Sequence, residues 1–251
     1  MLQAMRKLLL LLVVSFCWSC TDESGDVGFI DGGGVGVGGS TARFAINGEF
    51  LYIVSNTDLK VINISSVADP QYQSSTPIGS GIETIFGFKG NLFIGGQSGM
   101  KIYTVDALGR PTYRSEFVHR TACDPVIAND QYAYVTTRSG EGCNNTLFEA
   151  NRLVTLDVSN LDNPFDVDQQ QMINPRGLAF FKGDLFVAEG ASGLKQFSLE
   201  DPAHPVLIHF HTEIAANDMI ALENTMIITR DDGIYQFGCV DEDLELFSPI
   251  Q

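Results

Sequence analysis

The chain has 251 residues, and its 31 acidic residues outnumber 15 lysines and arginines, so the formal net charge is −16. Such an acidic chain is poorly suited to bind nucleic acid or anionic lipid headgroups, because like charges repel. Cationic ligands, divalent metals and neutral sugars remain open. Hydrophobic residues make up 44% of the sequence, and the length suits one large domain.

The first 19 residues predict a signal peptide. Two basic residues, Arg6 and Lys7, precede the apolar run Leu8–Val14. This run is too short to cross a bilayer, which needs about 20 apolar residues. A short apolar segment that ends in small residues is typical of an exported precursor. Residues 1–19 are therefore expected to be removed.

The end of this segment, Cys17–Cys20, resembles a bacterial lipobox, in which a small residue precedes the cysteine that is acylated. The resemblance implies that Cys20 becomes the lipidated N-terminus. The acyl chains would anchor the protein in a lipid membrane, since each buried methylene adds about 0.8 kcal/mol of affinity. Cys17 as the acceptor and an ordinary cleaved signal are the alternatives.

Residues 20–41 predict a flexible, unpacked tether. The segment is acidic at Thr21–Asp26 and rich in glycine at Asp31–Ser40. Acidic residues behind a lipidated cysteine, here Asp22 and Glu23, resemble the signal that carries Bacteroidetes lipoproteins to the outer face of the outer membrane. We therefore expect a lipid-anchored protein of the bacterial outer membrane, exposed at the cell surface. The alternative is that these residues only keep a linker soluble.

Residues 42–251 contain five copies of a repeat of about 41 residues. Short apolar stretches recur at intervals of 41, 41, 52 and 41, centred on Tyr52, Phe93, Tyr134, Phe186 and Ile227. A second series opens the next runs at intervals of 41, 53, 41 and 40, at Leu59, Met100, Leu153, Leu194 and Ile234. Prolines follow at matching intervals, at Pro70, Pro111, Pro164 and Pro205. Agreement among three series predicts one structural unit per repeat.

Each repeat predicts four short β-strands. In the first repeat, residues 42–46 lead through Asn47 and Gly48, a pair that favours a tight hairpin, into an apolar run at 50–55. An alternating run at 59–64 and a proline turn complete the unit. Four strands in about 41 residues match one propeller blade, so we predict an all-β fold, a β-propeller of five four-stranded blades. We expect a closed ring; an open array and a ring completed by a partner are the alternatives.

The third-strand segments Leu59–Asn63 and Leu153–Asp157 resemble the LVIVD repeat of bacterial propeller proteins. The other repeats keep the apolar positions of this motif and lack its terminal acid. The resemblance covers about residues 42–251. It implies a propeller fold and no particular activity, because propellers serve as enzymes, receptors and scaffolds alike.

The third repeat carries an insertion within residues 138–152, between its second and third strands. In a propeller this connection lies at the same end of the blade as the start of the innermost strand, so Cys143 and Cys123 are expected to form a disulfide. Exported proteins occupy compartments where disulfides persist. A bridge around 19 residues would stabilise the fold by about 3 kcal/mol. Two separate buried thiols are the alternative, and Cys239 is expected to be a small apolar filler.

The same end of the propeller is the expected ligand site, because loops and strand starts converge there on the axis. Four of the five residues ten positions before the first marker series are polar or charged, and several residues three positions after it are polar too. We predict a mouth lined by Glu83, Asp124, Arg176, Asn217, Glu189 and Arg230. The alternative is a solvated rim whose charges pair with each other.

No motif for a nucleophile, a phosphate loop or a zinc enzyme is present, and no cofactor is expected. His209 and His211 lie on one strand face, as a metal pair requires, but no third ligand stands at a recognisable spacing, so no metal site is predicted. We therefore expect a non-catalytic scaffold that binds an envelope protein or a glycan. The alternative is a saccharide hydrolase or lyase that uses Glu83 and Asp124 as acid and base.

Overall fold

The computed structural model describes residues 39–118, 125–139, 151–240 and 243–250. Its regular elements in these ranges are twenty β-strands, which form five four-stranded sheets. No helix in the described ranges has the length and hydropathy that crossing a bilayer would require. The predicted signal peptide, Cys20 and most of the predicted tether lie outside the described residues.

Each sheet consists of four consecutive strands that pair antiparallel in chain order. The first blade contains β1 (Phe44–Asn47), β2 (Phe50–Val54), β3 (Asp58–Asn63) and β4 (Gln71–Pro77). The second contains β5 (Ile82–Phe88), β6 (Asn91–Gly96), β7 (Gly99–Val105) and β8 (Pro111–Val118). The third contains β9 (Val126–Ala128), β10 (Tyr132–Thr137), β11 (Arg152–Asp157) and β12 (Phe165–Gln171).

The last two blades repeat this order. The fourth contains β13 (Leu178–Phe181), β14 (Asp184–Ala188), β15 (Leu194–Ser198) and β16 (Val206–His211). The fifth contains β17 (Asp218–Ala221), β18 (Thr225–Arg230), β19 (Gly233–Val240) and β20 (Asp243–Ile250). The protein is thus a five-bladed β-propeller, and the predicted fold class is confirmed.

Tight turns connect the first and second strands of the blades. Gly48 follows β1 with a φ of 59°, and Lys89 and Gly90 follow β5 with φ of 44° and 75°. Positive φ at a two-residue turn matches the right-handed twist of the paired strands. The expected hairpin is therefore present, but its two turn residues are Gly48 and Glu49, because Asn47 ends β1 and pairs with Phe50.

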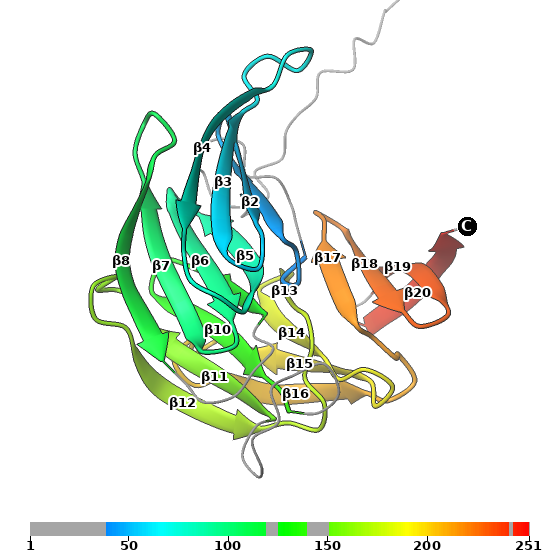
Figure 1. Cartoon of the computed structure of the whole chain (residues 1–251). Helices are drawn as coiled ribbons and strands as arrows, with labels where there is room; N and C mark the ends of the chain where they lie inside the picture. Colours follow the sequence, from blue (N-terminus) through cyan, green and yellow to red (C-terminus); the bar gives the residue numbers. More distant parts are fainter. Residues whose placement is uncertain (1–38, 119–124, 140–150, 241–242, 251) are drawn as a thin grey trace, which may run out of the picture.

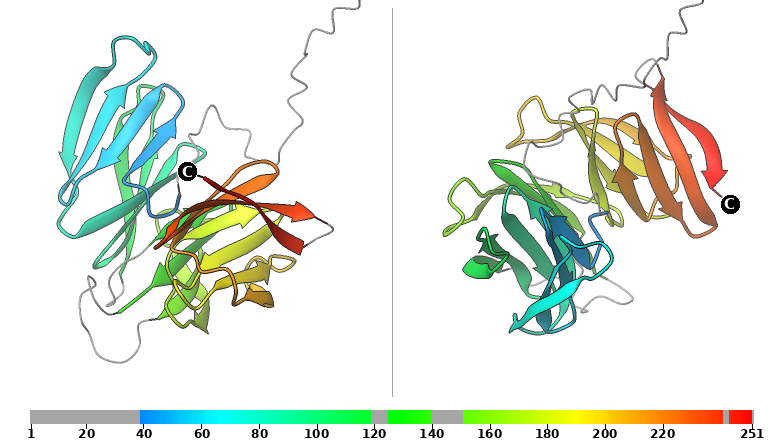
Figure 2. Two further views of the ribbon diagram at one scale, coloured as in Figure 1. Left: turned by 90° about the vertical axis from the view of Figure 1, so that its right-hand side faces the viewer. Right: turned by 90° about the horizontal axis from the view of Figure 1, so that it is seen from above.

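The five blades follow one another in chain order along an arc (Figure 1), and two further views show the first and last blades at its ends (Figure 2). The first strand of each blade packs against the first strand of the next, from β1 through β5, β9 and β13 to β17. The inner strands therefore surround the axis, and the fourth strands lie outermost.

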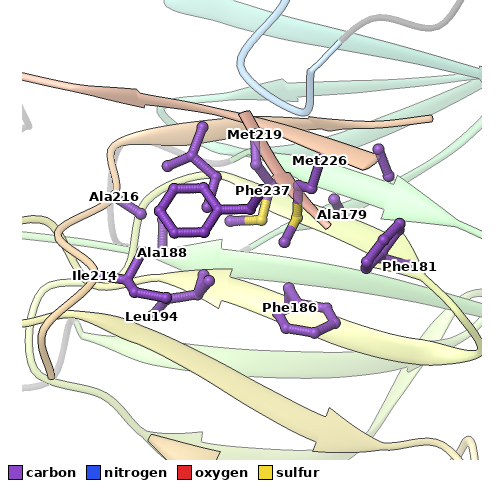
Figure 3. Packing of buried hydrophobic residues seen from close by; sticks show 12 residues of the cluster. Ala179, Phe181, Phe186, Ala188, Leu194, Ile214, Ala216, Met219, Met226 and Phe237 are labelled. Atoms are coloured by element: carbon purple, nitrogen blue, oxygen red, sulfur yellow. The ribbon is translucent and has the colours of Figure 1, made fainter. Parts of the chain in front are cut away.

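The hydrophobic core lies between blades, in four clusters that each join two consecutive sheets. Figure 3 shows the cluster between the fourth and fifth blades, where Phe186 and Leu194 pack against Met219, Met226 and Phe237. Each of the three middle blades thus buries one face on its predecessor and the other on its successor. In the described residues no such cluster joins the fifth blade to the first, so these two blades do not close the ring by packing together.

The repeat markers occupy equivalent places in this core. Each residue of the first marker series is the third residue of the second strand in its blade. Four of the five are exposed by at most 3%, namely Tyr52, Phe93, Tyr134 and Phe186. The fifth, Ile227, is only half-buried. The difference reflects its position on the face of the fifth blade that has no neighbour.

The insertion in the third repeat lies where it was predicted, between β10 and β11. Cys123 and Cys143 lie outside the described residues, so the predicted disulfide stays a prediction. Cys239 lies in β19 with an exposed side chain. The prediction that this thiol fills the core is wrong, because its side of β19 is not covered there by another blade.

Candidate functional site

The predicted mouth residues lie where inner strands begin and second strands end. The amide of Arg176, two residues before β13, donates to the carbonyl of Ala188 at the end of β14 (2.8 Å). The amide of Asn217, just before β17, likewise donates to Thr229 in β18 (2.8 Å). The two series of predicted residues are therefore neighbours at one end of the blades. Asp124 lies outside the described residues.

Arg176 connects three blades at this end. Its Nη1 donates to Oδ1 of Asn217 (2.6 Å), and Nδ2 of Asn217 donates to Oδ1 of Asp231 (2.7 Å). The backbone carbonyl of Arg176 accepts a hydrogen bond from Oγ1 of Thr136 in the third blade (2.6 Å). The structure thus brings together Arg176 and Asn217, as predicted from spacing alone.

The guanidinium of Arg176 still has an unused donor. Its Nε is buried and has no hydrogen-bond partner among the described residues. It lies over Gly190, where a Cβ atom would come within 3.0 Å of Nε. Glycine at this position therefore makes room for the arginine.

Arg138, directly after β10, is a mouth residue that the sequence analysis missed. Its side chain is half-buried. Burial lowers the pKa of the Arg138 guanidinium, and the nearby positive charge of Arg176 lowers that pKa further, whereas Glu83 raises it. Arg138 lies four positions after the marker Tyr134, whereas the predicted mouth included only positions three residues after the markers.

Glu83 lies in β5, and its Oε1 accepts a hydrogen bond from Nε2 of Gln97 (3.3 Å). Arg230 ends β18 and interacts within its own blade. Its Nε lies 3.1 Å from Oδ1 of Asp232, and its guanidinium carbon lies 4.4 Å from the centre of the Tyr235 ring. Glu83 and Arg230 thus stand at the mouth, each held by a neighbour on the same blade.

Glu189 follows β14 and is fully buried. Its Oε1 lies 2.7 Å from Nζ of Lys195, and its carboxylate accepts hydrogen bonds from the amides of Ile173 and Asn174. These bonds hold the segment that leads into Arg176. The structure therefore places Glu189 beneath the mouth, in a supporting position.

A short segment at the end of the predicted tether also reaches this end of the propeller. Ser40 is buried, and its Oγ donates to Asp218 and accepts from the amide of Leu178 (2.6 Å). Thr41 Oγ1 donates to the carboxylate of Asp218 as well. Residues Gly39 and Ser40 are therefore packed, in contrast to the unpacked tether expected here, because a buried carboxylate offers them acceptors.

Burial raises the pKa of Asp218, while the hydrogen bonds from Thr41 and Ser40 oppose this shift. The site leaves no space for larger residues nearby. A Cβ atom on Gly177 would come within 2.0 Å of Oδ1 of Asp218. Asp218 is a second residue that sequence reasoning missed, since nothing in the repeat distinguishes it from a solvated turn.

The two histidines considered for metal binding, His209 and His211, stack with ring centres 4.0 Å apart. The described residues contain no group of three or more His, Cys, Asp or Glu side chains placed to hold a metal ion.

The fold is a β-propeller, and Arg176, Asn217 and Asp231 are linked by hydrogen bonds at one end of its blades. The family model for the LVIVD repeat matches residues 38–76, which contain the first blade. This match and the five-bladed fold support the predicted repeat and propeller family. No curated protein matches the chain at a significant level.

Several solved structures share the fold. A protein from Lactobacillus plantarum aligns with a TM-score of 0.61 and 14% identity, over 80% of this chain and 67% of that one. A functionally unknown protein from Desulfotomaculum acetoxidans DSM 771 aligns with a TM-score of 0.60 and 10% identity, over 88% and 70%. The periplasmic gluconolactonase PpgL of Pseudomonas aeruginosa aligns with a TM-score of 0.59 and 13% identity, over 80% and 69%. At these identities the likeness extends to the fold only.

Proposed function

We propose that the protein is a non-catalytic binding scaffold that takes its ligand at the propeller mouth. One observation carries this proposal: Arg176 lies close enough to the half-buried Arg138 for its positive charge to lower the pKa of the Arg138 guanidinium, in a chain whose formal net charge is −16. Two guanidinium groups placed together in a partly buried site repel each other. A bound anion removes this repulsion, which gives the mouth a preference for ligands that carry negative charge.

The chemistry of arginine narrows the ligand further. A guanidinium binds a carboxylate through two parallel hydrogen bonds, and it is more weakly hydrated than an ammonium group. We therefore propose that the protein or glycan ligand presents a carboxylate, as an acidic peptide segment or a uronic acid does.

The location of the scaffold follows from the sequence. We propose that Cys20 is acylated and that residues 20–38 separate the propeller from the outer membrane of the bacterial envelope. Two or more acyl chains give stable anchoring. A mouth held away from the membrane in this way would meet ligands at the cell surface rather than lipid.

Binding of full-length protein to a glycan array that includes uronic acids, and to a panel of acidic peptides, tests this proposal. Arg176→Ala and Arg138→Ala should each weaken binding at least about tenfold, which corresponds to the loss of one charge-assisted interaction. Arg110→Ala is the matched control, because this exposed arginine lies in the turn between β7 and β8 at the other end of the blade. The Arg110→Ala variant should bind the ligand as tightly as the parent chain.

A turnover assay tests the alternative of a saccharide hydrolase or lyase. The gluconolactonase from Pseudomonas has the same fold, so the compounds tested in this assay should include sugar lactones and esters. Turnover that Glu83→Gln abolishes would overturn the non-catalytic proposal. Binding that neither arginine variant weakens would overturn the assignment of the site.

A further inference from the structure

The first and fifth blades each present one face that no other blade covers. On the first blade this face, here called the rear face, consists of Phe44, Ile46, Leu51, Ile53 and Ile62, which the strand register places side by side. Their neighbours Ala45, Tyr52 and Val61 point to the opposite face and pack against the second blade. The rear face therefore carries apolar residues on all three inner strands, with Lys60 as its charged residue.

On the fifth blade the uncovered face, here called the front face, carries four isoleucines. They are Ile220, Ile227, Ile234 and Ile250, and Thr229 and Gln236 lie between them. The opposite face of this sheet, with Met219 and Met226, packs against the fourth blade. Ile234 is 43% exposed and Ile250 is 44% exposed. Each end of the arc thus carries an apolar sheet face in contact with solvent.

Equivalent positions in the other blades show what such faces do. The residues equivalent to Leu51 are Leu92, Ala133, Leu185 and Met226, and all are fully buried against the preceding blade. The residues equivalent to Ile234 are Leu59, Met100, Leu153 and Leu194, which are exposed by at most 1%. The residue types are the same, and only the neighbour is missing. Both free faces therefore have the composition of a blade-to-blade interface.

A charged residue on the rear face also indicates that this face has the composition of a blade-to-blade interface. Lys60 is equivalent to Lys101 and Lys195, which form ion pairs of 2.7 Å with Glu116 and Glu189 on their own blades. In the first blade Ser75 stands opposite Lys60, where the second blade has Glu116. Lys60 is exposed and has no ion-pair partner among the described residues. A partner that covers this face is expected to bring the missing carboxylate.

The length of a structural neighbour indicates how many further sheets could fit between the two faces. The aligned 80% of this chain, about 200 residues, makes up 67% of the Lactobacillus protein, which is therefore about 300 residues long. About 100 residues of that protein are not aligned with this chain. This length corresponds to roughly two repeats of 41 residues, or two blades.

We propose that the rear face of the first blade and the front face of the fifth together form a docking site for a second protein, which inserts two four-stranded propeller-type sheets between them. Each inserted end contributes an apolar sheet face, and the sheet on the rear face contributes a carboxylate to Lys60. The contact continues the packing that the four interfaces within this chain already use. This inference is independent of the function proposed for the mouth.

Photo-crosslinking in cells that produce the full-length protein tests the docking site. A photo-reactive amino acid replaces Phe44 or Ile234, and Val67 serves as the control because it is 95% exposed and lies outside both faces. We expect positions 44 and 234 to link to one second protein, through peptides from strands of alternating apolar pattern, and position 67 not to do so. Links between the two faces of one chain, links to another copy of this chain, or no links at all would overturn the proposal.

Binding of the identified protein to purified variants then tests the chemistry. Phe44→Asp and Ile234→Asp should each weaken the complex at least about tenfold, and Lys60→Glu should weaken it more than Lys60→Arg. Val67→Asp should leave it unchanged. Because Phe44 and Ile234 are already half-exposed, the variants should keep the urea unfolding midpoint of the parent chain. Full affinity in the folded aspartate variants would refute the site.

Discussion

Glu189 and Lys195 form the most buried ion pair among the described residues, with side-chain exposures of 0% and 10%. The carboxylate also accepts the amides of Ile173 and Asn174, so it ties the segment before β13 to the end of β14. A buried charge is stable only when it is paired and hydrogen-bonded. Glu189 is therefore important for keeping Arg176 in place at the mouth.

Replacing Glu189 by alanine should lower the free energy of unfolding by about 3–5 kcal/mol, since Lys195 would remain buried without its partner. Urea unfolding measures this change. Glu116→Ala is the control, because the Lys101–Glu116 pair has the same 2.7 Å distance but greater exposure, 15% and 24%. Its cost should be about 1 kcal/mol or less. Equal costs for the two variants would show that burial does not decide the strength of these pairs.

Asp218 makes stability depend on pH. Burial raises its pKa above the ordinary value of 3.8, so between pH 3.8 and the raised value the folded protein binds more protons than the unfolded chain. Stability from this group is therefore present at low pH and is lost as pH rises through that window. Asp218→Asn removes this pH-dependent loss of stability, because asparagine does not ionise. Urea unfolding of both proteins between about pH 3.5 and 7 should show the variant gaining on the parent as pH rises, whereas a constant difference would contradict this account.

The spacing of the repeats is enough to predict that Arg176, Asn217 and Arg230 lie at one end of the blades. Spacing does not predict their partners. Asn217 meets Arg176 across 41 positions because two blades pack side by side. Partners of this kind depend on the angle between sheets, which no local pattern encodes.

At the scale of elements, two equivalent tyrosines connect second strands to the next blade. The hydroxyl of Tyr52 donates to the carbonyl of Gly109 (3.1 Å), and that of Tyr134 donates to the carbonyl of Pro202 (2.8 Å). Both acceptors lie in the turn between the third and fourth strands of the following blade. A buried tyrosine needs such an acceptor, and it thereby fixes one blade relative to the next.

Tyr134→Phe should lower the free energy of unfolding by about 1 kcal/mol, because the partly buried carbonyl of Pro202 loses its donor and the ring keeps its packing. Tyr72→Phe is the matched control, since Tyr72 is 64% exposed. Chemical denaturation should show no change for that variant. A similar loss in both proteins would mean that the interblade hydrogen bond contributes nothing of its own.

Strand positions were predictable because alternation and turn dipeptides act over a few residues. The exposure of Cys239 and the packing of Gly39 and Ser40 were not predictable in this way. Both depend on which sheet lies next to the segment, and the tertiary packing of the blades decides which sheet that is.

At the scale of the whole molecule, the blades differ in how many neighbours they have. The three middle blades bury both faces, whereas the first and fifth blades bury one each. Local opening is easier where fewer apolar contacts must be broken. The two ends of the arc are therefore expected to be its least stable parts.

Native-state hydrogen exchange of dilute protein should show this difference. Amides of β2 and β18 should exchange faster than those of β10, because the blade that contains β10 is covered on both faces. Equal protection of all three strands would mean that the first and fifth blades pack on each other in solution.

The sequence by itself determined the number of repeats, the four strands in each and the end of the blades at which polar residues gather. These properties follow from spacing and alternation along the chain. Only the tertiary structure decided which charges are partners and which apolar faces remain uncovered, because both depend on sheets that are distant in sequence. A residue such as Ile234 has the pattern of a core position, but whether it is buried depends on a neighbouring sheet.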